Sequence, residues 1–127
     1  MNAKEVVQGM YAAAARGDIE AFVGAASEDL VLEEPAFLPF GGTYHGREGF
    51  AAMLTKAATV LDVSSLTVDH IIAEGDQAFG VIRVRAQQDG AQLIVGEEST
   101  VRDDKIIKLR IFVHDAGPLA TGTGPAL

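Results

Sequence analysis

The sequence contains no cysteine, no tryptophan and only three histidines. The absence of cysteine excludes a disulfide framework and a thiolate metal site, and it is compatible with a reducing compartment such as the cytosol. The histidines are scattered, and none lies at i, i+4 spacing from another beside a glutamate, so there is no zinc signature. We therefore expect neither a bound metal nor another cofactor.

Positive charge and long apolar runs are also scarce. Ten Lys and Arg residues stand against 18 Asp and Glu residues, which gives a formal net charge of -8. Such a chain repels phosphate backbones, so nucleic acid is not an expected partner. No apolar run approaches the roughly 18 residues that span a membrane, and Met1–Glu5 lacks the basic flank and apolar core of a secretory signal. We expect a cytoplasmic protein without a membrane partner.

The chain does contain enough apolar residues for one folded unit. Hydrophobic residues make up 48% of its 127 positions and charged residues 22%, a balance typical of globular domains. This length accommodates a single hydrophobic core. The closing residues are rich in Gly, Thr, Pro and Ala. The expected organisation is one domain over residues 1–116 and a flexible tail over residues 117–127.

The first half of the sequence predicts three helices. Asn2 and Glu5 have the spacing of a capping box, and apolar residues then recur at helical spacing, which predicts a helix over residues 2–16. Gly17-Asp18 combines a C-terminal glycine with an N-cap aspartate and predicts a second, shorter helix packed against the first. A third amphipathic helix is expected to begin at Gly46.

The second half predicts an antiparallel meander, because apolar, β-branched segments are separated by turn dipeptides at regular intervals. Each predicted strand is longer than average and is therefore expected to curl. Helices followed by a curled sheet indicate an α+β fold in which the helices cover the concave face. The predicted strands are residues 66–74, 77–87, 91–102 and 105–115.

A pair of glutamates ends a short apolar strand in the first half. Leu30-Val31-Leu32 is followed by Glu33-Glu34 and then by a loop over residues 35–42 that contains two prolines and two glycines. A carboxyl group held against apolar walls resists ionisation, so its pKa rises toward the range useful for proton transfer. Glu34 is thus the first candidate for a catalytic residue that transfers protons. The alternative is that both glutamates simply end the strand in water.

The last predicted strand offers a second acid. Ile107, Leu109, Ile111 and Val113 are apolar, whereas Lys108 and Arg110 on the opposite parity are charged, so the apolar set is expected to face the core. Asp115 continues the inward parity and would lie at the rim of the concave face. The alternative is that Asp115 starts a turn.

Several short motifs, in this order and spacing, resemble the SnoaL-like branch of the NTF2-like superfamily, which includes ketosteroid isomerase. The likeness covers residues 2–115. It implies a cone formed by a bent sheet and three helices around an apolar pocket, and homodimers formed through the outer face of the sheet. The motifs are Tyr11, Arg16-Gly17-Asp18, Glu28-Asp29-Leu30, Glu34-Pro35, residues 42–47, Glu74-Gly75-Asp76 and the strand from Lys105 to Phe112.

The resemblance also implies roles for individual residues. Glu34 matches the catalytic aspartate base of ketosteroid isomerase, but the isomerase's oxyanion tyrosine falls on Met10, one residue before Tyr11. Methionine donates no hydrogen bond, so a steroid isomerase is not expected. The second oxyanion acid falls near Glu98, or on Glu97 if the alignment slips by one residue. In SnoaL-like cyclases an acid follows a Phe-containing strand, as Asp115 does here.

The sequence thus predicts a cofactor-free enzyme that transfers protons on a hydrophobic small molecule, as an isomerase, cyclase or dehydratase. Glu34 would be the base and Asp115 a second acid or base. The alternative is a non-catalytic dimeric domain that binds an apolar ligand or a protein partner. The alternative for Tyr11 is a core aromatic, and Phe37 and Phe40 either contact substrate or fill the core. The expected substrate-binding residues are Tyr11, Phe37, Phe40, Tyr44, Met53, Glu98, Ile111 and Val113.

Overall fold

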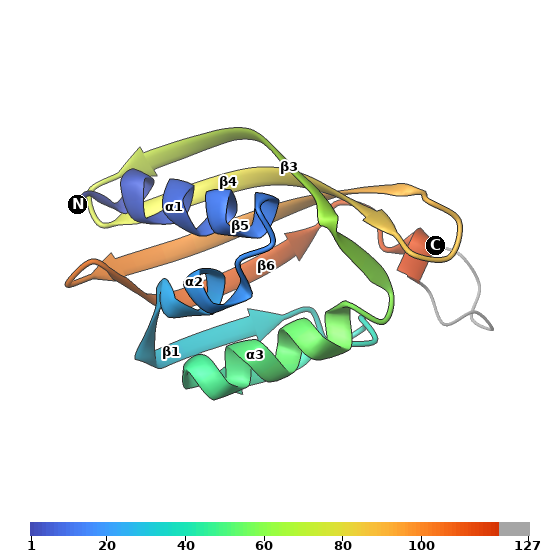
Figure 1. Ribbon diagram of the computed structural model, residues 1–127, viewed down its shortest axis with the longest axis horizontal. Coiled ribbons are helices and arrows are strands. Elements are labelled where there is room, and N and C mark those ends of the chain that lie inside the picture. Colours follow the sequence, from blue (N-terminus) through green and yellow to red (C-terminus); the bar gives the residue numbers. More distant parts are fainter. Residues whose placement is uncertain (120–127) are drawn as a thin grey trace.

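The computed structural model describes residues 1–119, which form three α-helices and six strands in one α+β unit (Figure 1). A final 3₁₀ turn follows the last strand. The elements are α1 (Ala3–Ala15), α2 (Ile19–Gly24), β1 (Ala26–Glu34), β2 (Gly42–His45), α3 (Gly46–Ala57), β3 (Leu61–Glu74), β4 (Gln77–Ala86), β5 (Gln92–Arg102), β6 (Lys105–Val113) and η1 (Gly117–Leu119).

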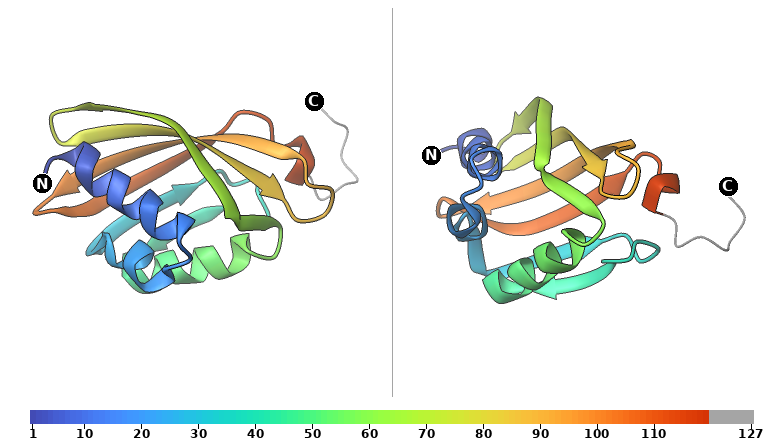
Figure 2. Two further views of the ribbon diagram at one scale, coloured as in Figure 1. Left: turned by 45° about the horizontal axis from the view of Figure 1, so that its top comes forward. Right: turned by 45° about the vertical axis from the view of Figure 1, so that its right-hand side comes forward.

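All six strands belong to one sheet with the order β2-β1-β6-β5-β4-β3. The predicted meander β3-β4-β5-β6 is confirmed, and its strands pair antiparallel throughout. The sheet as a whole is mixed rather than antiparallel, because β1 lies parallel to β6. This long-range pairing follows from no local sequence signal. The sheet is strongly bent, and the three helices lie across its concave side (Figure 2).

The helix signals in the sequence are confirmed. Asn2 and Glu5 form a complete capping box at the start of α1, and the Asp18 side chain accepts a hydrogen bond from the backbone N–H of Ala21 at the start of α2. Gly17 adopts a φ of 73° between the two helices, a conformation that glycine adopts without strain. These caps fix where α1 and α2 begin and hence which side chains they direct at the sheet.

Short β2 was not expected, because the sequence around it reads as a loop. It pairs antiparallel with the end of β1, so that Tyr44 lies opposite Leu32 and Gly42 lies opposite Glu34. The Tyr44 hydroxyl donates to the carbonyl of Phe40 at 2.8 Å. The pairing and this hydrogen bond together hold the intervening loop against the end of β1, which places Phe40 in the core.

The long strand β3 bends over the helices because its pairing with β4 is irregular. Register shifts fall between Asp62 and Thr67 and again between Val68 and His70. In the first irregular stretch the Ser65 side chain replaces a missing ladder partner, accepting from the backbone N–H of Arg85 at 2.9 Å. Bulges increase the local twist of a strand. The bend brings the first part of β3 toward α3 and closes one side of the concave face.

The first three residues of the expected tail, 117–119, form the 3₁₀ turn η1. Strand β6 ends at Val113, and the Asp115 side chain accepts a hydrogen bond from the backbone N–H of Gly117 at 2.9 Å, which starts η1. Leu119 in η1 is buried. The rest of the predicted tail, residues 120–127, lies outside the described residues. Within the described part, no helix is long and apolar enough to cross a membrane.

Candidate functional site

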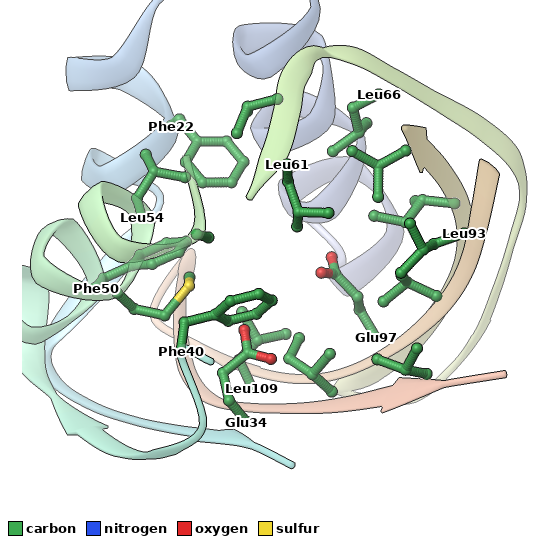
Figure 3. A pocket seen from close by; sticks show the side chains of 18 of the residues that line it. Phe22, Glu34, Phe40, Phe50, Leu54, Leu61, Leu66, Leu93, Glu97 and Leu109 are labelled. Carbon is green, nitrogen blue, oxygen red and sulfur yellow. The ribbon is translucent and has the colours of Figure 1, made fainter. Parts of the chain in front are cut away.

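The concave face of the sheet and the three helices enclose an apolar cavity of about 80 Å³ (Figure 3). That volume has room for several water molecules or a compact ligand. Every helix, the bent start of β3, the four strands β1, β4, β5 and β6, and η1 contribute to its wall. Its lining residues are Met10, Phe22, Glu34, Phe40, Phe50, Met53, Leu54, Ala57, Leu61, Val63, Leu66, Ile82, Val84, Leu93, Val95, Glu97, Leu109, Ile111, Val113 and Leu119.

Glu34 lies in this wall, as the sequence predicted. It shares the inward parity of Leu30 and Leu32, whereas Glu33 faces outward and accepts a hydrogen bond from Arg110 at 3.0 Å. The Glu34 side chain is only 8% exposed, and its Oε1 atom has no hydrogen-bond partner. Burial, reinforced by the charge of Glu97, raises the pKa of Glu34 to about 8. This carboxyl group is therefore held in the position and protonation range of a functional acid.

Glu97 is the second acid of the cavity, and its carboxyl group points into the same space as that of Glu34 (Figure 3). The Tyr11 hydroxyl donates a hydrogen bond to Glu97 Oε1 at 2.8 Å. Burial raises the pKa of Glu97 to about 7, while the hydrogen bond from Tyr11 opposes the rise. The pKa of Tyr11 is itself raised by burial and by the neighbouring carboxylate, so Tyr11 remains a donor.

A glycine makes room for this hydrogen bond. Gly80 in β4 lies opposite Glu97 in β5. A Cβ atom on Gly80 would lie 2.5 Å from the hydroxyl oxygen of Tyr11 and 2.9 Å from its ring. No side chain fits at such a distance without displacement of its neighbour. The absence of a side chain at position 80 thus allows Tyr11 to reach across β4 to Glu97.

Five of the ten predicted site residues line the cavity. They come from the end of β1, the loop before β2, the third helix and the last strand, so elements distant in sequence meet at this one space. Tyr11, a sixth, contacts the site only through Glu97. The five that line the cavity are Glu34, Phe40, Met53, Ile111 and Val113.

The other four predicted site residues lie elsewhere. Glu98 faces the outer side of the sheet, where its Oε1 atom is 4.0 Å from Arg110, so the one-residue slip in alignment selects Glu97. Asp115 is exposed because β6 ends two residues earlier and the alternation stops with it. Phe37 is 69% exposed. Tyr44 holds the loop before β2 in place, because its hydroxyl donates a hydrogen bond to the carbonyl of Phe40.

The alternation along β5 is the signal that could have selected Glu97. Leu93 and Val95 before it, and Val101 after it, are buried on the inward face, and Glu97 shares their parity. An acid on the apolar parity of a strand points to the same face as the buried side chains. The contact with Tyr11 had no such signal, because it joins residues 86 positions apart.

Metal-ligating side chains are few around the cavity in the described part of the chain. Among residues 1–119, no three His, Cys, Asp or Glu side chains come together in a group that could hold one. The cavity itself supplies two carboxyl groups and no imidazole. The polar groups in and beside the cavity are those two carboxyl groups and the hydroxyl of Tyr11.

The fold is shared with several solved structures. An NTF2-like protein of unknown function from Burkholderia pseudomallei is 22% identical, with 96% of this chain and 99% of that chain covered and a TM-score of 0.79. A candidate polyketide cyclase from Sinorhizobium meliloti is 19% identical, with 85% and 94% covered and a TM-score of 0.69. TerC, co-crystallised with polyporic acid, is 25% identical, with 86% and 88% covered and a TM-score of 0.71.

The sequence comparisons identify the family. No curated protein matches the chain. The family model of the SnoaL-like domain matches residues 7–109, a span that includes Tyr11, Glu34, Gly80 and Glu97. With that match and the NTF2-like cone of its structural neighbours, the chain belongs to the SnoaL-like family.

Proposed function

We propose that this protein is a cofactor-free enzyme that uses general acid–base catalysis to transfer protons on a compact hydrophobic substrate. The observation that carries the proposal is the convergence of two carboxyl groups, Glu34 and Glu97, in one otherwise apolar cavity. A buried acid without a protein partner destabilises the fold, and Glu34 Oε1 is such a group. Paired acids with raised pKa values are typical of catalytic sites.

The surroundings of the two acids assign them different roles. Tyr11 donates to Glu97 and so favours its ionised form, whereas Glu34 receives no donor and feels the charge of Glu97. As pH rises through neutrality, Glu97 therefore ionises before Glu34. Glu97 is the base in this proposal and Glu34 the neutral acid, which reverses the role expected for Glu34 from sequence.

These roles suit the formation of an enolate. The Glu97 carboxylate removes a proton from a carbon next to a carbonyl group, and the electrons of the C–H bond form a C=C bond. The carbonyl oxygen gains the negative charge and accepts a hydrogen bond, or the proton, from Glu34. Return of a proton to another carbon gives isomerisation, and attack of the enolate carbon on a second carbonyl gives aldol cyclisation.

The fold neighbours support this reaction class. One neighbour is a candidate polyketide cyclase, and TerC was crystallised with polyporic acid, an organic small molecule. The non-catalytic alternative, a dimeric domain that binds an apolar ligand or a protein partner, accounts for the cavity but not for its acids. It predicts carboxyl groups with ordinary pKa values, so a titration of Glu34 and Glu97 separates the two functions. The burial that raises the pKa of both acids favours the catalytic one.

Deuterium exchange tests the proposal without a known substrate. Cyclohexanone and 2-indanone are incubated with the protein in D₂O near pD 7.5, and loss of their α-proton signals is followed by NMR. The wild-type protein should accelerate exchange, and Glu34→Gln and Glu97→Gln should each reduce that acceleration by about 100-fold or more.

Matched controls lie next to each acid on the opposite face. Glu33→Gln and Glu98→Gln remove the same charge from the outer side of the sheet and should leave exchange unchanged. The catalytic proposal is wrong if the wild-type protein accelerates exchange of neither ketone. It is also wrong if all four variants exchange alike, and either result favours the non-catalytic binding domain.

A further inference from the structure

The charge of the cavity wall has one sign. Of the lining residues in the described part of the chain, Glu34 and Glu97 are polar and the others are apolar. No Lys, Arg or His side chain reaches the cavity from the part of the chain that the structure describes. The nearest additional donor, the Tyr11 hydroxyl, is already used by Glu97. The wall can therefore compensate a positive charge on a ligand but not a negative one.

An anionic ligand is opposed in two ways. Its charge would leave water for an apolar space without a counter-ion, which is costly unless the charge is paired. It would also meet the negative charge that the two glutamates already hold. A carboxylate or phosphate group on a ligand must then stay outside the cavity.

A cationic or hydrogen-bond-donating ligand is favoured by the same wall. Glu34 Oε1 lacks the donor that a buried carboxyl oxygen requires, and a ligand can supply it. Phe22, Phe40 and Phe50 line the same space (Figure 3). Aromatic faces attract ammonium groups, more strongly in a desolvated site.

We propose that the cavity selects compact hydrophobic molecules that are uncharged or carry an ammonium group, and excludes anions of the same size. A protonated amine binds with its nitrogen at Glu34 and Glu97, both ionised in that complex, and its ring among the apolar side chains. This inference rests on the site of the proposed function, and it adds the charge class of the ligand.

The binding of an amine should strengthen as pH rises. In α1 the Tyr11 hydroxyl contacts Glu97, and Tyr11 stays protonated. Among the described residues, those that line the cavity from α2, α3, β3, β4, β6 and η1 carry no titratable group, so within residues 1–119 Glu34 and Glu97 set the pH dependence. Both become ionised as pH rises toward 8 and beyond, whereas a simple aliphatic amine remains protonated there.

Three probes of nearly equal size test whether the cavity binds a cationic, an uncharged or an anionic ligand. Benzylamine, benzyl alcohol and benzoate are titrated into the ¹⁵N-labelled protein at pH 6.0 and 8.5, and amide shifts are followed by NMR. We expect benzyl alcohol to bind equally at both pH values, benzylamine to bind at least about fivefold more tightly at pH 8.5, and benzoate not to bind. The shifted amides should belong to residues around the cavity.

Glutamine variants test whether the two acids cause the pH dependence of benzylamine binding. Glu34→Gln and Glu97→Gln should each reduce the pH dependence of benzylamine binding, and the double variant should abolish it, whereas Glu33→Gln should bind as the wild type does. Benzoate binding as tight as that of benzylamine overturns the inference, and so does failure of all three probes to shift the cavity amides. The readout is binding alone, so a protein that binds amines but does not exchange ketone protons refutes the proposed function and not this inference.

Discussion

The hydroxyl of Tyr11 donates a hydrogen bond to Oε1 of Glu97 at 2.8 Å, across 86 positions of sequence. This contact makes the two acids of the cavity unequal. Both glutamates are desolvated, but only Glu97 has a donor that stabilises its ionised form. A single hydrogen bond from helix α1 thus determines which of two similar carboxyl groups ionises first.

Loss of that donor should raise the pKa of Glu97. In Tyr11→Phe the ring remains to fill the core, but the carboxylate loses a hydrogen bond of about 1.5–3 kcal/mol, equivalent to about one to two pKa units. Carboxyl ¹³C chemical shifts measured against pH should show the rise for Glu97. The carboxyl of Glu33, which pairs with Arg110 on the outer face, is the internal control. An unchanged Glu97 titration would mean that Tyr11 only fills space.

Gly80→Ala should break the same contact from the other side. The new Cβ would lie 2.5 Å from the Tyr11 hydroxyl oxygen, so Tyr11 must move away from Glu97. We expect a loss of about 1–3 kcal/mol in the free energy of unfolding, typical of overpacking, measured by urea denaturation. Gly9→Ala in α1 is the matched control, because a Cβ there meets nothing within 4 Å. That control should be neutral or stabilising, since alanine favours helix.

The sequence predicted those parts of the fold that local patterns determine. The capping box at Asn2, the helical spacing of apolar residues and the turn dipeptides predicted the helices and the meander, and the apolar strand before Glu34 selected that acid, because each signal depends on neighbouring residues. The parallel pairing of β1 with β6 depends on distant contacts and was not predicted. Glu97 remained one of two choices, because a shift of one residue in register exchanges the two faces of a strand.

Asp115 should be dispensable for chemistry. Its side chain is exposed and accepts the N–H of Gly117 at 2.9 Å, so its role in the structure is to start the turn that leads to Leu119. Asp115→Asn, which retains a carbonyl oxygen able to accept that bond, should leave ketone proton exchange within about twofold of wild type. The NMR exchange assay described for Glu34→Gln measures this directly. A loss as large as that of Glu34→Gln would return Asp115 to the catalytic site.

The outer face of the sheet is the surface on which we expect a homodimer to form. Phe112 is 46% exposed there with its ring centroid 6.1 Å from that of Phe79, and Ile72, which pairs with Phe79 across β3 and β4, is 63% exposed. Contiguous apolar patches of this kind often mark interfaces. Sedimentation velocity should give a dimer for the wild type and a monomer for Phe112→Lys. Phe37→Lys, at a more exposed position in the loop before β2, should not change the mass.

Stability should fall as pH rises through the titration of the two acids. Glu34 and Glu97 have folded-state pKa values of about 8 and about 7, above the value near 4.5 expected in the unfolded chain. Below about pH 4.5 both states hold these protons and the contribution to stability is fully present. Between that pH and about 8 the unfolded chain releases protons that the folded protein retains, so the free energy of unfolding falls, by at most about 1.4 kcal/mol for each unit of pKa difference.

In Glu34→Gln and Glu97→Gln the replaced side chain cannot ionise. The free energies of unfolding of these variants should therefore decline less than that of the wild type between about pH 5 and 8.5. Glu33→Gln keeps both buried acids and should decline as the wild type does; parallel curves for all four proteins, measured by urea denaturation at each pH, would show that neither acid is held neutral by the fold.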